Sequence, residues 1–195
     1  MRIGVLELQG DFAAHARALK EAGTDAVPVR LPQHLAALDG LVLPGGESTT
    51  LLTLLARDEL FQAVQDFAAR KPVFGTCAGC ILLAHQVVPQ QASFGAIDIT
   101  VERNAYGRQN DSVVLTTPTS LPGGAMEAVF IRAPRIVEIG PDVAVLASRD
   151  GTPVLVRQGH VLAATFHPEL SADRRVHALF LRMAAERASD RRVRV

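Results

Sequence analysis

The sequence predicts an α/β fold: a single domain with a doubly wound, mixed but mainly parallel sheet flanked by helices. The first half alternates short apolar runs, which suit buried strands, with amphipathic helical patterns. A strand–helix–strand–helix order builds a parallel sheet covered on both faces. The second half changes to short strands joined by turns such as Asp150-Gly151 and Gln158-Gly159, which indicates antiparallel additions.

In the first half, each strand is an apolar run and each helix carries an apolar stripe at helical spacing. The first helix ends at Gly23, a residue suited to the left-handed turn that closes helices. We expect strands at 2–8, 25–30, 41–43 and 73–74, and helices at 11–22, 48–55, 58–70 and from 81 onward.

The second half is expected to return to the main sheet near Phe166 and to close with a helix. The domain is predicted to cover residues 1–188, with 189–195 as a basic, frayed tail. We expect strands at 96–101, 112–116, 128–131, 143–148, 153–157 and 161–166, and the last helix at 170–187.

Composition excludes several classes of function. Among the 195 residues, 20 basic and 20 acidic side chains cancel, so nothing favours nucleic acid or an anionic membrane as a partner. A hydrophobic content of 48% fits a compact globular chain, and no apolar run is long enough to span a bilayer. The 2 cysteines, Cys77 and Cys80, are too close in sequence to join distant elements, so we expect a cytoplasmic protein.

Cys77 lies in the string Gly-Thr-Cys-Ala-Gly at 75–79, between a predicted strand and a predicted helix. This arrangement is typical of a nucleophile elbow, in which small flanking residues permit a sharp turn and a close approach by substrate. The helix N-terminus directs free N–H groups at the sulfur and favours the reactive thiolate. The elbow also supplies an oxyanion donor, the N–H of Ala78. Gly46, at the end of a neighbouring strand, is the predicted second donor.

A base and an acid follow in Phe-His-Pro-Glu at 166–169. In an extended segment His167 and Glu169 lie on one side, and Pro168 stiffens the spacing between them. Cys77, His167 and Glu169 are therefore predicted to form a triad that cleaves a carbon–nitrogen or related acyl bond. His160 is the weaker second candidate for the base, and the remaining histidines are interpreted as structural or surface residues.

A second interpretation uses the same cysteines. Cys77 and Cys80 form Cys-x-x-Cys at a helix start, as in thioredoxin-like redox sites. That hypothesis leaves Gly-Glu-Ser at 46–48 and His-Pro-Glu at 167–169 without a role, so Cys80 is expected to be a packing residue. No second cysteine pair or histidine pair suggests zinc, and neither a metal nor a cofactor is predicted.

Five strings together resemble the class I (triad) glutamine amidotransferases, and within them the glutaminase subunits of pyridoxal 5′-phosphate synthase. The likeness runs from Ile3 to the last helix. The strings are Leu-Pro-Gly-Gly-Glu-Ser-Thr-Thr at 43–50, Gly-Thr-Cys-Ala-Gly at 75–79, Glu-Arg-Asn-Ala-Tyr-Gly-Arg-Gln at 102–109, Phe-Ile-Arg-Ala-Pro at 130–134 and Phe-His-Pro-Glu-Leu at 166–170.

The resemblance implies hydrolysis of L-glutamine to L-glutamate and ammonia through a thioester on Cys77. The arginines would suit the substrate's α-carboxylate and Glu47 its α-ammonium group. Cys80 departs from the family, where an aliphatic residue is expected. The substrate-binding residues implied are Gly46, Glu47, Ser48, Arg103, Ile131 and Arg132.

The resemblance also implies a partner, a (β/α)8-barrel synthase subunit that receives the ammonia and activates the glutaminase on docking. Two alternatives remain open at this point. One is a glutaminase that serves imidazole glycerol phosphate synthesis. The other is a non-catalytic activator with the same fold, which the intact triad residues Cys77, His167 and Glu169 disfavour.

Overall fold

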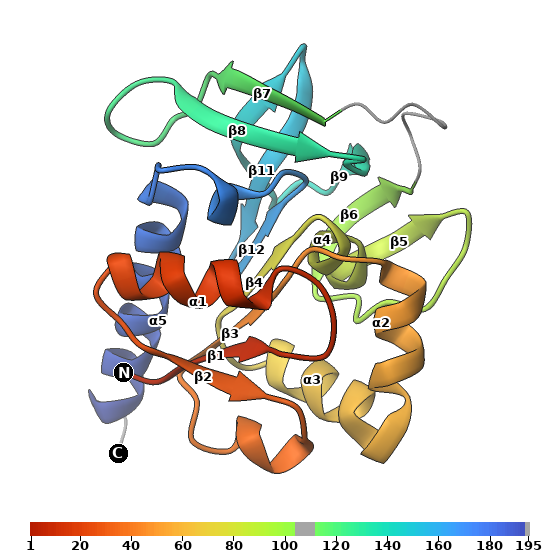
Figure 1. Ribbon diagram of the computed structural model, residues 1–195, viewed down its shortest axis with the longest axis vertical. Coiled ribbons are helices and arrows are strands. Elements are labelled where there is room, and N and C mark those ends of the chain that lie inside the picture. Colours follow the sequence, from red (N-terminus) through yellow and green to blue (C-terminus); the bar gives the residue numbers. More distant parts are fainter. Residues whose placement is uncertain (104–111, 194–195) are drawn as a thin grey trace.

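The computed structural model describes residues 1–103 and 112–193 and is built around a seven-stranded sheet in the order β10-β11-β12-β4-β3-β1-β2 (Figure 1). The five strands from β2 to β12 are parallel, and β11 and β10 extend the sheet in antiparallel fashion. The strands are β1 Ile3–Leu6, β2 Ala26–Val29, β3 Gly40–Leu43, β4 Val73–Thr76, β10 Ala144–Arg149, β11 Thr152–Gln158 and β12 Val161–Ala164. The predicted mainly parallel, mixed sheet is confirmed.

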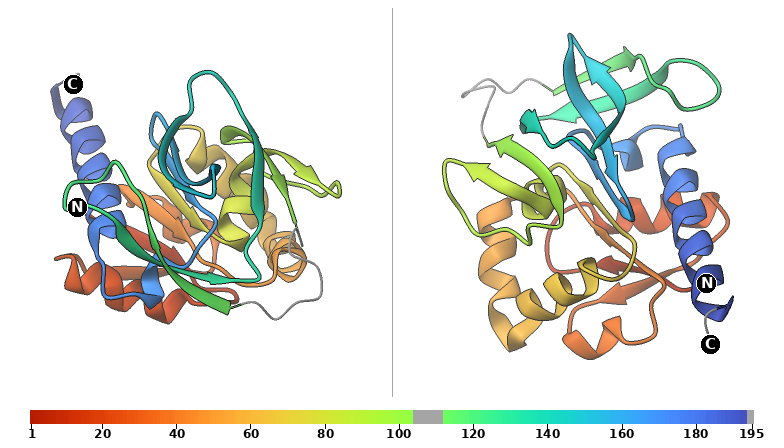
Figure 2. Two further views of the ribbon diagram at one scale, coloured as in Figure 1. Left: turned by 90° about the horizontal axis from the view of Figure 1, so that it is seen from above. Right: turned by 180° about the vertical axis from the view of Figure 1, so that it is seen from behind.

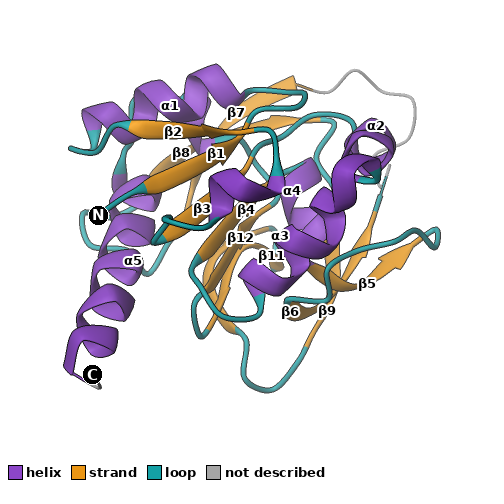
Figure 3. Ribbon diagram, turned by 90° about the horizontal axis from the view of Figure 1, so that it is seen from below, coloured by secondary structure: helices purple, strands orange, loops and turns teal. Residues whose placement is uncertain are grey.

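Helices cover both faces of this sheet (Figures 1 and 3). In β3, Leu41 and Leu43 pack into the core beneath one set of helices, whereas Val42 packs into the core on the opposite face. The side chains of successive strand residues thus build two separate cores. The first set is α2 Ser48–Leu55, α3 Leu60–Ala68 and α4 Ala78–Leu83, and the second is α1 Phe12–Glu21 and α5 Arg175–Val193.

Two smaller sheets lie beside the main one, in the upper half of Figure 1, and Figure 2 shows them from two further sides. One joins β5 Ala84–Val88, β6 Ile97–Glu102 and β9 Arg135–Ile139, and the other is the hairpin of β7 Ser112–Thr117 and β8 Met126–Ile131. The N–H of His167 donates to Val129 O of β8 at 2.8 Å. This bond ties the hairpin to the segment that follows β12.

The structure corrects several predicted elements. The helix expected at 58–70 is interrupted because Asp58 and Glu59 have positive φ, so α3 begins at Leu60. Ala84 starts β5 and does not continue a helix, and β5 and β9 were not predicted at all. The last helix begins at 175 and runs to 193, whereas the sequence predicted a helix at 170–187.

Residues 104–109 of the third resemblance string and residues 194–195 of the tail lie outside the described residues. Within 1–103 and 112–193, no helix has the length and apolar character needed to cross a membrane.

Candidate active site

Cys77 is the hinge between strand β4 and helix α4. It has φ 47° and ψ −105°, a conformation that costs an L-residue on the order of 1–3 kcal/mol. Its N–H donates to Ala164 O at 2.9 Å, which fixes it against the end of β12. The segment therefore has the sharp strand–turn–helix geometry predicted for an elbow, with the strain located at the sulfur-bearing residue.

The flanking glycines are required by close packing. A Cβ on Gly79 would lie 2.0 Å from Leu43 O, and a Cβ on Gly75 would lie 2.5 Å from the carbonyl of Gly79. Both contacts are with backbone, which cannot move aside as a flexible side chain could. The Gly-x-Cys-x-Gly spacing thus allows α4 to start directly above β3 and β4.

His167 and Glu169 lie together beside Cys77, but not as an extended pair. Pro168–Leu170 forms a short 3-10 turn, and this turn brings Glu169 Oε1 to 2.7 Å from His167 Nδ1. The predicted contact exists, whereas the predicted extended geometry is wrong. His167 is 3% exposed and Glu169 4%, so the pair is almost completely shielded from water.

The protonation of His167 reflects opposing influences. Burial lowers its pKa, but hydrogen bonds with Cys77 and Glu169, together with the negative charges of both, outweigh burial and raise the pKa to about 10. The imidazolium is therefore the favoured form at neutral pH. A protonated imidazole beside a cysteine can give its proton to a leaving group.

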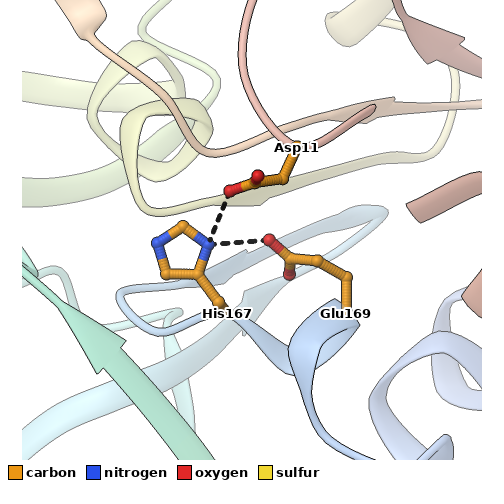
Figure 4. Close-up of side chains that lie close together, drawn as sticks. All are labelled: Asp11, His167 and Glu169. Atoms are coloured by element: carbon orange, nitrogen blue, oxygen red, sulfur yellow. Dashed lines mark hydrogen bonds and ion pairs between the residues drawn. The ribbon is translucent and has the colours of Figure 1, made fainter. Parts of the chain in front are cut away.

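Asp11 is a second carboxylate beside the imidazole, and the sequence analysis missed it (Figure 4). Its Oδ2 lies 3.5 Å from His167 Nδ1, and its side chain is about half exposed at 45%. The available signal was its position just after β1, at the same sheet edge as Cys77. Ligand atoms of Asp11, His167 and Glu169 lie within 4.8 Å of one another, so they could hold a cation. Because His167 Nδ1 already donates to Glu169, such a cation would remove the base from use.

A pocket of about 210 Å³ opens over Cys77 and His167. Every predicted substrate-binding residue lines it, although these residues come from three separate parts of the chain. Ala78 is buried at the start of α4, below the lining. The complete lining is Gln9, Asp11, Gly46, Glu47, Ser48, Cys77, Ile81, Arg103, Ile131, Arg132, Pro134 and His167.

The turn after β1 holds the glycine loop of the pocket in place. The N–H of Asp11 donates to Gly45 O at 3.2 Å, and the N–H of Glu47 donates to Gln9 Oε1 at 2.9 Å. The Glu47 carboxylate caps α2 by accepting from the N–H of Thr49 at 3.2 Å. Two loops from neighbouring strands thus support each other around the substrate space.

The predicted arginines approach the pocket from different elements. Arg103 Nη1 donates to Gln91 Oε1, and the same oxygen accepts a hydrogen bond of 3.2 Å from the Ser48 hydroxyl. Arg132 follows β8 with a φ of 44°, which is unusual for a residue with a side chain. Such strain, in a pocket-lining residue, is typical of functional sites.

The structure supports neither the redox role considered for Cys80 nor the role of catalytic base considered for His160. Cys80 is fully buried, and burial followed by the nearby charge of Cys77 raises the pKa of its thiol, which disfavours the thiolate that redox exchange needs. The carbonyl of His160 accepts from the N–H of Val73, at the start of β4, and its ring contacts Ala68 O at 2.9 Å. His160 therefore lies at the opposite end of β4 from Cys77, and the prediction of a second base was wrong.

Comparison with known proteins places this geometry in context. Residues 5–186 match the SNO glutamine amidotransferase family. The chain is 62% identical to pyridoxal 5′-phosphate synthase subunit PdxT of Koribacter versatilis, over 94% of this chain and 95% of that protein. It is 55% identical to the subunit of the same name from Solibacter usitatus, over 92% and 97%.

Solved structures agree at the level of the fold. One, described as a glutamine amidotransferase, is 45% identical and superposes with a TM-score of 0.88, covering 95% of this chain and 100% of that one. A chain in the structure of PurLQS from Thermotoga maritima is 19% identical with a TM-score of 0.63, covering 97% of this chain and 97% of that one, and it shares the fold.

Proposed function

The chain belongs to the SNO glutamine amidotransferase family, and from that premise we propose that Cys77, His167 and Glu169 are the triad with which it hydrolyses L-glutamine to L-glutamate and ammonia. It is a glutaminase subunit of pyridoxal 5′-phosphate synthase, as its 62% and 55% identical relatives are subunits of that synthase. The single observation that carries the assignment is the 2.7 Å bond that Glu169 forms with His167, which lines the pocket beside the strained Cys77.

The reaction proceeds in two halves. Cys77 Sγ attacks the side-chain amide carbon of glutamine, and His167 gives its proton to the departing nitrogen, so that ammonia leaves and a thioester remains. Water then attacks the thioester while His167 takes up its proton. The products are glutamate and the original cysteine. Glu169 keeps the imidazole oriented and stabilises its charged form throughout.

The tetrahedral oxyanion would be held by the N–H groups of Ala78 and Gly46. Ala78 is the first residue of α4, where N–H groups have no partner within the helix. Gly45 O accepts from Asp11, and a trans peptide directs its N–H away from its C=O, so Gly46 N–H points away from that loop. A Cβ on Gly45 would lie 3.3 Å from Cys77 Cβ, so this peptide is next to the nucleophile.

Substrate recognition would use the charged lining of the pocket. We assign Arg103 and Arg132 to the α-carboxylate and Glu47 to the α-ammonium group of glutamine. Gly46, Ser48 and Ile131 complete the wall. We propose that the synthase partner, which receives the ammonia, is a (β/α)8 barrel. We also propose that the glutaminase unit covers residues 1–188 and that the protein is cytoplasmic. The scheme needs no metal or cofactor.

The test is glutaminase activity with and without the purified synthase subunit. We expect ammonia and glutamate in equal amounts, activation by the synthase, and complete loss of turnover in Cys77→Ala. Turnover that survives in Cys77→Ala would disprove the triad. Ammonia delivery only to the imidazole glycerol phosphate enzyme would favour the glutaminase of that synthesis. Reduction of insulin disulfides that depends on Cys80 would favour the redox interpretation.

A further inference from the structure

Behind the triad, two more histidines continue the chain of polar contacts into the core. His15 of α1 and His177 of α5 are both 0% exposed. His15 Nε2 lies 3.3 Å from Glu169 Oε2 and 3.0 Å from Thr76 Oγ1, and His15 Nδ1 lies 3.2 Å from His177 Nε2. The network thus joins the acid, the residue before the nucleophile and the C-terminal helix.

Both histidines are neutral at physiological pH. Burial, with help from Arg174, lowers the pKa of His177 to about 3. Burial, the largest cause, holds the pKa of His15 well below its ordinary value, and the positive charge of His167 acts in the same direction. An apolar ring, that of Phe74 in β4, contacts both histidines. Its centroid lies 6.1 Å from that of His15 and 5.8 Å from that of His177.

A neutral imidazole carries one proton, so the contacts determine which nitrogen holds it. An ionised Glu169 can only accept, and its buried Oε2 has no hydrogen bond in the described structure but lies 3.3 Å from His15 Nε2, so the proton of His15 belongs on Nε2. His15 Nδ1 is then an acceptor and takes its hydrogen bond from His177 Nε2–H. His177 Nδ1 is left as a bare lone pair, and it is indeed without a partner in the described structure.

The opposite arrangement, with both His15 and His177 protonated at Nδ1, is unfavourable at both ends of the network. It would place the lone pair of His15 Nε2 against a carboxylate, and it would leave a buried N–H on His177 Nδ1 without an acceptor. Buried N–H groups without partners are rarer than buried acceptors without partners. The arrangement of donors is therefore fixed from His177 through His15 to Glu169.

We propose that His15 and His177 are positioning residues that hold the triad acid: His177 donates to His15, and His15 presents its Nε2–H to Thr76 Oγ1 and to the charge on Glu169 Oε2, leaving Oε1 aimed at His167. This inference rests on the proposed triad. Glu169 follows β12 in a short turn with no long helix or strand of its own to hold it, and its second oxygen, buried and without a hydrogen bond, has the 3.3 Å contact with His15 as its polar neighbour. The shared contact with Thr76 ties the same donor to the strand that carries Cys77.

The kinetic test compares His15→Leu, His15→Gln and His177→Leu in the full chain with its synthase. His15→Leu should lower kcat about 10- to 100-fold, as for other outer-shell partners of an orienting group, with little change in the KM for glutamine. His15→Gln keeps an N–H donor and should recover most of the rate. The control is His160→Leu, since His160 is at the other end of the sheet. A kcat for His15→Leu equal to that control, or a change in KM alone, overturns the proposal.

A second measurement does not depend on turnover. Imidazole ¹⁵N NMR of the wild-type chain should show His15 protonated at Nε2 and bare at Nδ1, and His177 likewise protonated at Nε2. Protonation of His15 at Nδ1 overturns the proposed hydrogen-bond arrangement even if the enzyme is active. If the wild type shows these tautomers but releases no ammonia with its synthase, the proposed function fails while the hydrogen-bond arrangement stands.

Discussion

Asp11 is the N-cap of helix α1, yet its carboxylate makes no capping hydrogen bond and lies 3.5 Å from Nδ1 of His167. An aspartate at this position ordinarily accepts from the first free N–H groups of the helix, which stabilises it by about 1 kcal/mol. Here that contribution is forgone and the negative charge faces the imidazolium. The residue thus favours the chemistry of the site over the stability of its own helix.

Asp11→Ser should separate these two roles. Serine is an equally good N-cap and, if it turns to the helix, should raise the free energy of unfolding by up to about 1 kcal/mol. The same change removes a charge beside His167 and should lower kcat. Urea unfolding and glutaminase kinetics with the synthase measure the two effects. A variant that loses stability and keeps its kcat would show that Asp11 acts on the helix alone.

Cys77 offers a test of strain. Cys77 is the N-cap of α4, where glycine is already somewhat better than alanine, and at φ 47° and ψ −105° glycine is also the residue whose backbone fits. Both Cys77→Gly and Cys77→Ala should be inactive, and Cys77→Gly should be the more stable of the two by about 1 kcal/mol, the lower end of the strain expected there. Thermal unfolding of the pair decides the matter, and a Cys77→Ala variant as stable as Cys77→Gly would exclude strain at this residue.

Gly46→Ala tests the proposed oxyanion peptide, provided the neighbouring contact is controlled. A Cβ on Gly46 would lie 2.5 Å from Gln9 Oε1, the atom that accepts from the N–H of Glu47. Loss of one oxyanion donor lowers kcat by about 10²–10³. Alanine keeps the backbone N–H, but its Cβ would press on Gln9 at a φ of 157° and turn the peptide, so we expect a loss of this size in Gly46→Ala and a smaller one in Gln9→Ala. Equal losses in the two single variants and in the double variant would assign the whole effect to Gln9.

The buried His177 predicts a pH dependence of stability. Its pKa is about 3 in the folded chain and about 6.5 when unfolded, so between these values the unfolded state binds a proton that the folded state does not. Stability should therefore fall as pH drops below 6.5, by about 1.4 kcal/mol per pH unit for this group. His177→Leu should remove that part of the slope, as measured by urea unfolding at several pH values.

Exposed His85 provides the matched control for this experiment, because His85→Leu changes the same residue type at the surface. In His85→Leu, the free energy of unfolding should change with pH as steeply as in the wild type. A slope in His177→Leu indistinguishable from both would mean that His177 is protonated in the folded state.

Patterns local in sequence predicted the fold and the centre of the site. The elbow around Cys77 could be predicted because its glycines, strand and helix are contiguous, and the pocket lining followed from the resemblance. Asp11 and His15 were missed because their roles arise from a parallel crossover that places α1 against the turn after β12. No spacing rule within α1 reveals that one face of the helix meets Glu169.

The boundaries failed for equally local reasons. Asp58 and Glu59 adopt positive φ inside an otherwise helical pattern, which residue type alone does not indicate. β9 lies at the edge of a small sheet with most of its residues exposed, so its short apolar pattern was easily missed.

The pairing of β4 with β12 has a further consequence. Thr76 is in register with Ala164, whose carbonyl accepts from the N–H of Cys77, and His167 follows three residues later. The distance between sulfur and imidazole is thus set by backbone ladder bonds in the middle of the molecule. A docking protein that switches turnover on has no need to assemble these two groups. Such a protein can act instead on the loops at the rim of the pocket, where the displacement of one peptide could start or stop the reaction without disturbing the sheet.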